Sequence, residues 1–325
     1  MIKRVIFSML LVVGSVWGAG WVGAQTLDYP TKPIILQVPW PAGGSTDMGA
    51  RIVAAIAEKK MGQPIVVTNR VGAGSQIGLN ETARQKPDGY YLGFASLPAL
   101  NTIILDPERK AAFDLNSLVF IINQVIDPGI IWAKGDNPYK TLKDLLDDAR
   151  KRPGQIRAAT TGILGDDHLA ILMMEEAAKV KFRIVHFDGG AHVFTAVLGG
   201  QVDVAFGNIG DIASKAKGTP LRVLVVMDPE RSKFMPDVPT SAELGFPKII
   251  SSSSRGLLGP SGIPQPILKK IQTVFLEAMK DPEHLDKMDK SGLAVKPLVG
   301  EEYMKYVLDL QQRVAPLMEI ARKSK

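Results

Sequence analysis

The chain has 325 residues, which is enough for two domains of ordinary size. Hydrophobic residues make up 46% of it and charged residues 22%, a mixture that excludes a disordered, collagen-like or coiled-coil protein. The 39 Lys and Arg residues exceed the 33 Asp and Glu residues by only six, so composition gives no indication of a nucleic-acid partner. The absence of cysteine excludes disulfides, thiolate nucleophiles, zinc ribbons and a cysteine-linked lipid anchor.

Residues 1–24 have the pattern of a secretory signal peptide. Lys3 and Arg4 precede an apolar run over Val5–Val13, and Val22-Gly23-Ala24 resembles a cleavage site before Gln25. Because glycines interrupt the later part of the segment, we expect cleavage rather than a retained membrane anchor. The sequence therefore predicts export to the periplasm.

From Lys32 onward, short β-branched runs alternate with Gly-rich turns and amphipathic helical patterns. This alternation predicts an α/β fold with a largely parallel sheet. The first predicted strands are Ile34–Pro39, Ile65–Thr68 and Tyr90–Ser96, with helices over Thr46–Lys60 and through Thr82–Gln85. Two apolar runs follow, Phe120–Val125 and Ile130–Lys134, and Asp127-Pro128-Gly129 separates them. We expect the chain to cross into a second domain there.

The second predicted domain repeats the α/β pattern. Its helices are predicted at Leu142–Arg152, Asp167–Ala178 and His192–Leu198, and its strands at Gln155–Ala159, Arg183–Phe187, Val202–Phe206 and Arg222–Met227. Two C-terminal helices, Ile267–Lys280 and Glu301–Lys323, are expected to cover the first sheet. The predicted division is residues 25–125 plus 253–325 for domain 1 and 126–252 for domain 2, with a ligand cleft between the two.

Ligands of such sheets bind beyond the carboxyl ends of the strands, so the turns there are the candidate site. The turn Gly43-Gly44-Ser45-Thr46-Asp47 opens a helix and offers backbone N–H groups, hydroxyls and the positive end of a helix dipole. That combination suits a carboxylate or phosphate, although such residues also simply cap helices. The turn lacks the Walker A lysine, so nothing supports ATP hydrolysis. Ser96 and Asn208 lie at the ends of two further predicted strands.

Other chemistries find weaker support. The run Gly72–Gly78 is a loosened dinucleotide fingerprint, but no acidic residue follows where a ribose would need one. His168, His186 and His192 lie close together in sequence, yet their spacing matches no metal motif. No Gly-x-Ser-x-Gly elbow or nucleophile–base pair is present. We therefore predict no catalytic residues, no metal and no cofactor, and we expect His168 to be a hydrogen-bond donor in the cleft.

A long, ordered set of motifs resembles the extracytoplasmic solute receptors of the tripartite tricarboxylate transporter type, the Bug/TctC family. In the first half these are Tyr29-Pro30, Pro39–Asp47, Arg51, Gly62-Gln63-Pro64, Asn69–Gly74, Gly78 and Pro87–Tyr90. In the second half they are Gly162, His168-Leu169, Gly189-Gly190, Gly199–Asp203, Pro236–Thr240, Glu243-x-Gly245, Gly256-Leu257, Pro260 and Pro264. The resemblance covers essentially the whole chain after the signal segment.

The resemblance implies a type II periplasmic-binding-protein fold, in which two hinged α/β domains close over a small organic acid or amino-acid-like ligand. It also implies a membrane permease as partner, although a sensor that feeds a signalling partner, an exported enzyme or a metal-binding protein on the same scaffold remain alternatives. The family holds carboxylates with loops that match Trp40–Asp47, Gly72–Gln76 and Thr160–Gly162. The candidate ligand-binding residues are Trp40, Gly44, Ser45, Thr46, Gly74, Ser75, Ser96, Thr161, Gly162, His168, Asp188 and Asn208. We expect a monomer.

Three departures from the family pattern concern the ligand. Asp166 and Asp167 stand where small polar residues are usual, Asp188 replaces a common lysine, and Ser251–Arg255 replaces aromatic residues. An acidic wall would repel a plain dicarboxylate. Our hypothesis is that the ligand carries an amine or hydroxyl groups opposite its carboxylate.

Overall fold

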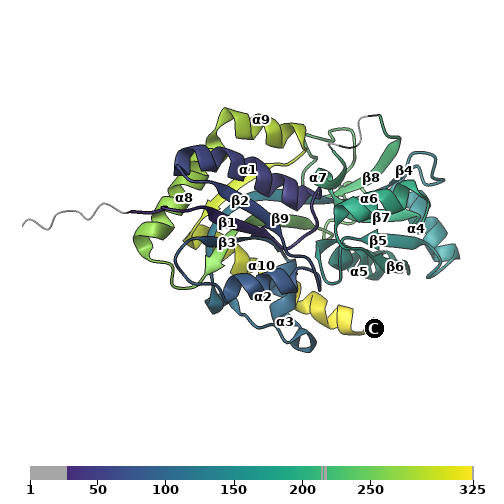
Figure 1. Ribbon diagram of the computed structural model, residues 1–325. Helices are drawn as coiled ribbons and strands as arrows, with labels where there is room; N and C mark the ends of the chain where they lie inside the picture. Colours follow the sequence, from purple (N-terminus) through teal and green to yellow (C-terminus); the bar gives the residue numbers. More distant parts are fainter. Residues whose placement is uncertain (1–27, 214, 216–217, 324–325) are drawn as a thin grey trace, which may run out of the picture.

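The computed structural model describes residues 28–213, 215 and 218–323 of the chain (Figure 1). The predicted signal peptide, residues 1–24, lies outside the described residues. Strands and helices alternate along most of the chain, which confirms the predicted α/β class. None of the helices in the described part is both long and apolar enough to cross a membrane.

The first sheet combines parallel and antiparallel strands. Strand β1 (Ile34–Val38) pairs in parallel with β2 (Ile65–Asn69) and β3 (Tyr91–Leu97). Strand β9 (Ser252–Pro260) then runs antiparallel between β3 and the first part of β4 (Leu118–Lys134). Strand β10 (Val295–Val299) adds an antiparallel edge on β4, so β9 and β10 join late segments of the chain to its first strands.

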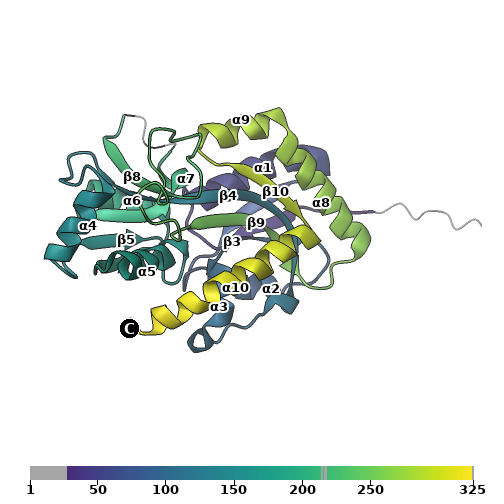
Figure 2. The ribbon, with the colours of Figure 1, turned by 180° about the vertical axis from the view of Figure 1, so that it is seen from behind.

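Helices cover both faces of the first sheet (Figures 1 and 2). On one side lie α1 (Ser45–Met61), α8 (Gln265–Lys280) and α9 (Pro282–Lys290), and on the other α2 (Gln76–Ala83), α3 (Ala99–Leu105) and α10 (Glu301–Lys323). Helix α1 ends at Gly62, whose φ of 76° is left-handed and whose N–H donates to the Glu58 carbonyl. Buried side chains of β1, α1 and α8 pack together beneath these helices, and a second group packs under α10.

The second sheet has the order β6, β5, β7, β4, with β8 also paired to β4. Its strands are β5 (Arg157–Thr160), β6 (Arg183–His186), β7 (Val204–Asn208) and β8 (Leu221–Met227). Its helices are α4 (Leu142–Lys151), α5 (Asp166–Ala178), α6 (Gly190–Leu198) and the short α7 (Ile209–Ile212).

Strand β4 continues through Asp127-Pro128-Gly129, so the two apolar runs on either side of it belong to one strand. Residues up to Pro128 pair with β9 in the first sheet, and Gly129 onward pairs with β7 and β8 in the second. The Pro-Gly pair thus stands where one strand passes between two sheets rather than in a turn.

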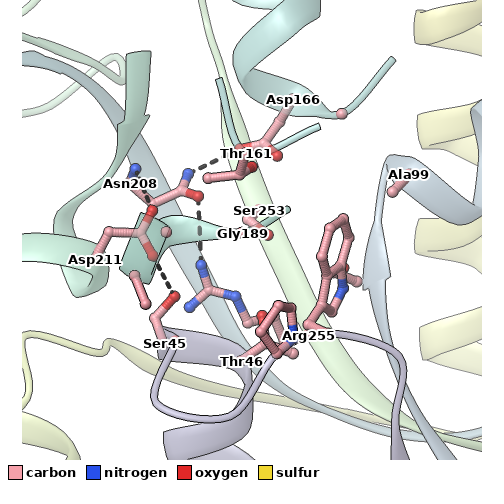
Figure 3. A pocket seen from close by; sticks show the side chains of 17 residues that line it. Ser45, Thr46, Ala99, Thr161, Asp166, Gly189, Asn208, Asp211, Ser253 and Arg255 are labelled. Atoms are coloured by element: carbon pink, nitrogen blue, oxygen red, sulfur yellow. Dashed lines mark hydrogen bonds between the residues drawn. The ribbon is translucent and has the colours of Figure 1, made fainter. Parts of the chain in front are cut away.

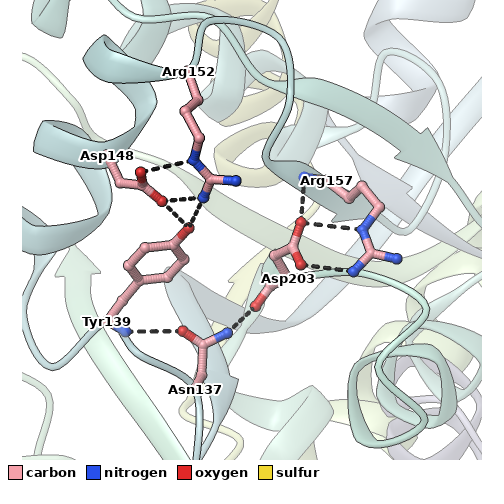
Figure 4. A network of polar contacts seen from close by, with 6 residues as sticks. All are labelled: Asn137, Tyr139, Asp148, Arg152, Arg157 and Asp203. Atoms are coloured by element: carbon pink, nitrogen blue, oxygen red, sulfur yellow. Dashed lines mark hydrogen bonds and ion pairs between the residues drawn. The ribbon is translucent and has the colours of Figure 1, made fainter.

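A polar network ties the connections of the second sheet to one another (Figure 4). Asp203 pairs with Arg157 at 2.7 Å and accepts an amide hydrogen bond from Asn137 at its carbonyl, also at 2.7 Å. The Tyr139 hydroxyl donates to the Asp148 carboxylate at 2.6 Å. Through these contacts, the segment before α4 is held to the turn before β7, and that turn is held to the start of β5.

Candidate ligand-binding site

A small cavity lies where the carboxyl ends of strands from both sheets face each other (Figure 3). Its lining residues are Trp40, Pro41, Gly44, Ser45, Thr46, Ser96, Ala99, Thr161, Gly165, Asp166, Gly189, Gly190, Ala191, Asn208, Asp211, Ser253 and Arg255. The cavity encloses about 40 Å³, which is space for about three water molecules. A ligand of more than a few non-hydrogen atoms enters only if the two sides separate.

Three helices point their N-termini at this cavity. Helices α1, α5 and α6 begin after Gly44, Gly165 and Gly189, and none of these glycines can offer a side chain to cap the helix. The first-turn N–H groups of a helix have no partner within the helix, and the helix dipole places positive charge beside them. All three glycines line the cavity, so uncapped donors from both sides meet there.

Polar side chains connect the two sides across the cavity. The Ser45 hydroxyl donates to Asp211 Oδ1 at 2.6 Å, and the Asn208 backbone N–H donates to Asp211 Oδ2 at 3.2 Å. The Asn208 side-chain amide donates to Asp166 Oδ2 at 2.8 Å. Gly190 lies so close that a Cβ there would be 2.5 Å from Asp211 Oδ1. The glycine allows α6 to begin directly against this carboxylate.

A buried ion pair forms one wall of the cavity. Arg255 Nη1 lies 2.9 Å from Asp127 Oδ2, with side chains 3% and 0% exposed, and Arg255 Nη2 donates to Asn208 Oδ1 at 3.3 Å. Burial raises the pKa of Asp127 to about 7, although Arg255 and the Gly210 N–H act in the opposite direction. Within the described part of the chain, Arg255 Nε has no hydrogen-bond partner.

Two further carboxylates stand at the start of α5. Burial raises the pKa of Asp166, and it raises the pKa of Asp167 well above its usual value, with neighbouring carboxylates adding to the effect on Asp167. Asp167 accepts hydrogen bonds from the Thr161 hydroxyl at 2.6 Å and the Thr161 N–H at 3.1 Å. Asp167 thus positions the Thr161 loop, whereas Asp166 lines the cavity itself.

The structure brings most of the predicted ligand-binding residues together. Those that line the cavity are Trp40, Gly44, Ser45, Thr46, Ser96, Thr161 and Asn208. The Trp40 indole N–H donates to the Ser96 hydroxyl at 2.6 Å, so these two side chains form one unit at the edge of the cavity.

Five of the predicted residues do not line this cavity. Gly74, Gly162 and Asp188 line a separate groove outside it, together with Arg109 and His192. Ser75 is buried, with a left-handed backbone at the start of α2. His168 is also buried, and its Nδ1 accepts a hydrogen bond from the Leu164 N–H at 3.0 Å.

The clustered histidines contact one another rather than a common centre. The His168 and His186 rings pack edge to face at 4.7 Å, and burial lowers the pKa of His168 to about 4. Burial also lowers the pKa of His186, so the environment favours the neutral form of both rings. Across residues 28–213, 215 and 218–323, no group of three or more His, Asp or Glu side chains is placed to hold a metal ion.

Three polar residues that line the cavity, Asp211, Ser253 and Arg255, were not among the predicted ligand-binding residues, and neither was Asp127, which pairs with Arg255. Asp211 follows Asn208 by three positions, a capping-box spacing that could have singled it out. Ser253 and Arg255 lie in a polar run that shows no strand pattern, and Asp127 lies in what reads as a turn.

Comparison with known proteins decides the family. The sequence model of one protein family, the tripartite tricarboxylate transporter family receptor, matches residues 49–322 of this chain. The chain belongs to this receptor family. Its members are substrate-binding receptors and not enzymes, in agreement with the resemblance drawn from the motifs. Protein BugT of Bordetella pertussis is similar, with 28% identity over 295 residues that cover 90% of each chain.

Solved structures of similar receptors share the fold. The periplasmic binding protein BugD is 27% identical, with a TM-score of 0.83 over 90% of this chain and 98% of BugD. MatC of Rhodopseudomonas palustris, solved with bound malate, is 25% identical, with a TM-score of 0.80 over 90% and 99% of the two chains. These likenesses confirm the expected two-domain periplasmic-binding-protein fold.

Proposed function

We propose that this receptor captures a small carboxylate-containing molecule between its two domains and delivers it to a membrane permease of the tripartite tricarboxylate type. One observation carries the proposal, namely the three uncapped helix N-termini that meet at a single cavity. Unpartnered N–H groups and aligned helix dipoles favour an anion without a charged side chain. The bound malate of the related MatC is consistent with a carboxylate ligand.

The proposed ligand contacts come from both sides of the cavity. Ser45, Thr46 and Ser96 place hydroxyls in the cavity wall from the first side, and Thr161 and Asn208 place polar side chains there from the second. The five predicted residues outside the cavity would then act through loop position rather than direct contact. Gly74 and Gly162 fit this role, because Arg109 donates to the Ala73 and Ile163 carbonyls beside them at 3.1 and 3.0 Å.

The remaining parts of the proposal concern the whole receptor. We propose domain 1 as residues 25–125 plus 253–325 and domain 2 as residues 126–252, which agrees with the passage of β4 between sheets. Related solved proteins are periplasmic, which supports export by a cleaved signal segment. The receptor is proposed to act as a monomer, and closure around the ligand would provide the shape that the permease recognises.

A thermal-shift screen of the chain from Gln25 tests the proposal. The panel contains mono-, di- and tricarboxylates, amino acids, aromatic acids, sugar acids and divalent metal ions. A ligand that binds only the folded state raises the melting temperature according to its concentration and affinity. We expect shifts with carboxylate-containing compounds. Shifts with metal ions alone, or with none of the compounds, would contradict the proposed function.

A further inference from the structure

The side chains around the cavity include more acidic than basic groups. Asp166 and Asp211 line it, and Asp127 and Asp167 are buried beside it. Among the described residues that line the cavity, Arg255 is the one cationic side chain. Asp127 already neutralises Arg255 at 2.9 Å, so the other carboxylates have no cationic partner in the wall.

The two lining carboxylates differ in how much of their hydrogen-bonding capacity is used. Asp211 accepts from Ser45 at one oxygen and from the Asn208 N–H at the other. Asp166 lines the cavity and accepts from the Asn208 side chain at Oδ2, and a carboxylate can accept further hydrogen bonds beyond that one. Figure 3 shows the Asn208 amide between the Asp166 carboxylate and the Arg255 guanidinium. One amide thereby separates an anionic from a cationic group.

Arg255 provides a second, independent sign of a ligand. Its side chain is 3% exposed and lines the cavity, yet its Nε donor lacks a hydrogen-bond partner in the described part of the chain. A buried donor without a partner is costly, and a ligand oxygen would remove that cost. The cavity therefore offers donors for an anion beside Arg255 and the helix N-termini, and an acceptor for a cation at Asp166.

We propose that the ligand is a small zwitterion, whose carboxylate meets Arg255 and the helix N-termini and whose ammonium group is received by Asp166. This inference rests on the proposed solute-binding function and specifies its substrate class. A second carboxylate in place of the ammonium group would face Asp166 and Asp211, and like charges in a poorly solvated cavity repel strongly.

The test is isothermal titration at pH 7 with matched compounds. Glycine, L-alanine, β-alanine and 4-aminobutyrate carry both charges, whereas acetate, propionate, malonate, succinate and malate lack the amine. Each compound is titrated into the wild-type chain from Gln25, into Asp166→Asn and into Asp136→Asn. Asp136→Asn is the matched control, because it makes the same chemical change at an exposed residue that lies outside the cavity and pairs with Lys134.

We expect the wild type and Asp136→Asn to bind at least one amino acid and to prefer it to its amine-free counterparts. Asp166→Asn should weaken that binding about tenfold or more, because a charge-assisted hydrogen bond is lost. It should also leave the binding of amine-free acids unchanged or stronger, a readout that requires a folded variant. Circular dichroism and unliganded melting temperatures check the fold of each variant.

Three results would overturn the inference. Binding of malate or succinate without binding of any amino acid would refute the zwitterion and leave the carboxylate receptor standing. Amino-acid binding with the same preference in Asp166→Asn would refute the role of this carboxylate. No binding of either class would refute the proposed function and the inference together.

Discussion

Ser45 shows how the hydroxyl of one residue at a helix start links the two sides of the cavity. It is the first residue of α1 and is buried, and its hydroxyl donates across the cavity to Asp211 at 2.6 Å. The contact requires the two sides to be close together. It therefore stabilises the arrangement in which the cavity is enclosed.

Replacing Ser45 with alanine should lower the free energy of unfolding by about 1–2 kcal/mol, because it leaves a buried carboxylate oxygen without its donor. It should also weaken ligand binding. Chemical denaturation and titration measure the two effects. Thr195→Ala, on the exposed part of α6, removes a hydroxyl that contacts only a local carbonyl and should change neither quantity. Equal effects of both variants would contradict this role for Ser45.

A second residue-scale feature is the buried His284, which has a defined tautomer. Its Nδ1 lies 3.1 Å from the Met279 carbonyl and so carries the proton, and its Nε2 accepts from the Gln124 amide at 3.0 Å. Burial lowers the pKa of His284 to about 4. The folded state therefore holds this ring neutral where the unfolded chain would protonate it.

The stabilisation that neutral His284 provides should be complete above pH 6.5 and should fall as the pH drops toward 4. The loss is on the order of 3 kcal/mol for a shift from about 6.5 to 4. Asp127 changes the free energy of unfolding in the opposite direction. Because its pKa is raised in the folded state, it lowers stability as the pH rises. Comparing the wild type with His284→Gln separates the two. Their difference in free energy of unfolding should shrink from pH 7 to pH 4, and a constant difference would refute this explanation.

At the scale of elements, β9 lies inside the first sheet and carries polar residues to the cavity. It lies between β3 and β4 and contributes the lining residues Ser253 and Arg255. At Gly256 an added Cβ would be 2.5 Å from the Ile122 carbonyl oxygen and 2.6 Å from Asn123 Cα. The close pairing of β9 with β4 therefore requires glycine.

Gly256→Ala should destabilise the protein by about 2–3 kcal/mol, because the clash is with backbone that cannot move independently. Gly259→Ala on the same strand meets the end of the Ile263 side chain at 2.8 Å, which can change rotamer. Its cost should be clearly smaller. Denaturation midpoints compare the two variants, and equal losses would contradict the tight backbone approach at Gly256.

The elements that could be predicted are those whose pattern is local. Units of strand, Gly-rich turn and helix were visible in the sequence, and β1, α1, α5 and α10 appear within one or two residues of the expected bounds. Strand β9 was not predicted, because a buried run of serines and an arginine has no apolar alternation. Its polar groups are satisfied only by partners remote in sequence, such as Asn123 for Ser254 and Asp127 for Arg255.

The candidate site shows the same limit. Glycines and hydroxyls that follow predicted strands could be placed at the cavity from the sequence. Which acidic residues join them could not, because Asp166 and Asp188 both follow strands while only Asp166 faces the cavity. Asp127 and Arg255 depend on how β4 passes from one sheet to the other, a property of the assembled sheets.

At the scale of the whole molecule, two apolar contacts join the domains away from the cavity. The side chain of Leu164, in the loop before α5, belongs to the same buried apolar cluster as Leu97 and Leu100 of the first domain. Helix α10 packs its C-terminal part, including Met318, against α5 (Figure 2). Across the cavity the two sides are joined by polar contacts such as that of Ser45 with Asp211, whereas the contact of α10 with α5 is apolar. We therefore expect opening to begin at the cavity, while the α10 contact is kept.

The most direct test of the central claim is hydrogen exchange, read by mass spectrometry, with and without the tightest-binding compound of the panel. Residues 45–48, 166–169 and 190–193 begin α1, α5 and α6. We predict slower exchange in all three segments when the ligand is bound and unchanged exchange in α9, which lies outside the cavity. Protection confined to the outer groove, or no protection at the three helix starts under saturating ligand, would contradict the account.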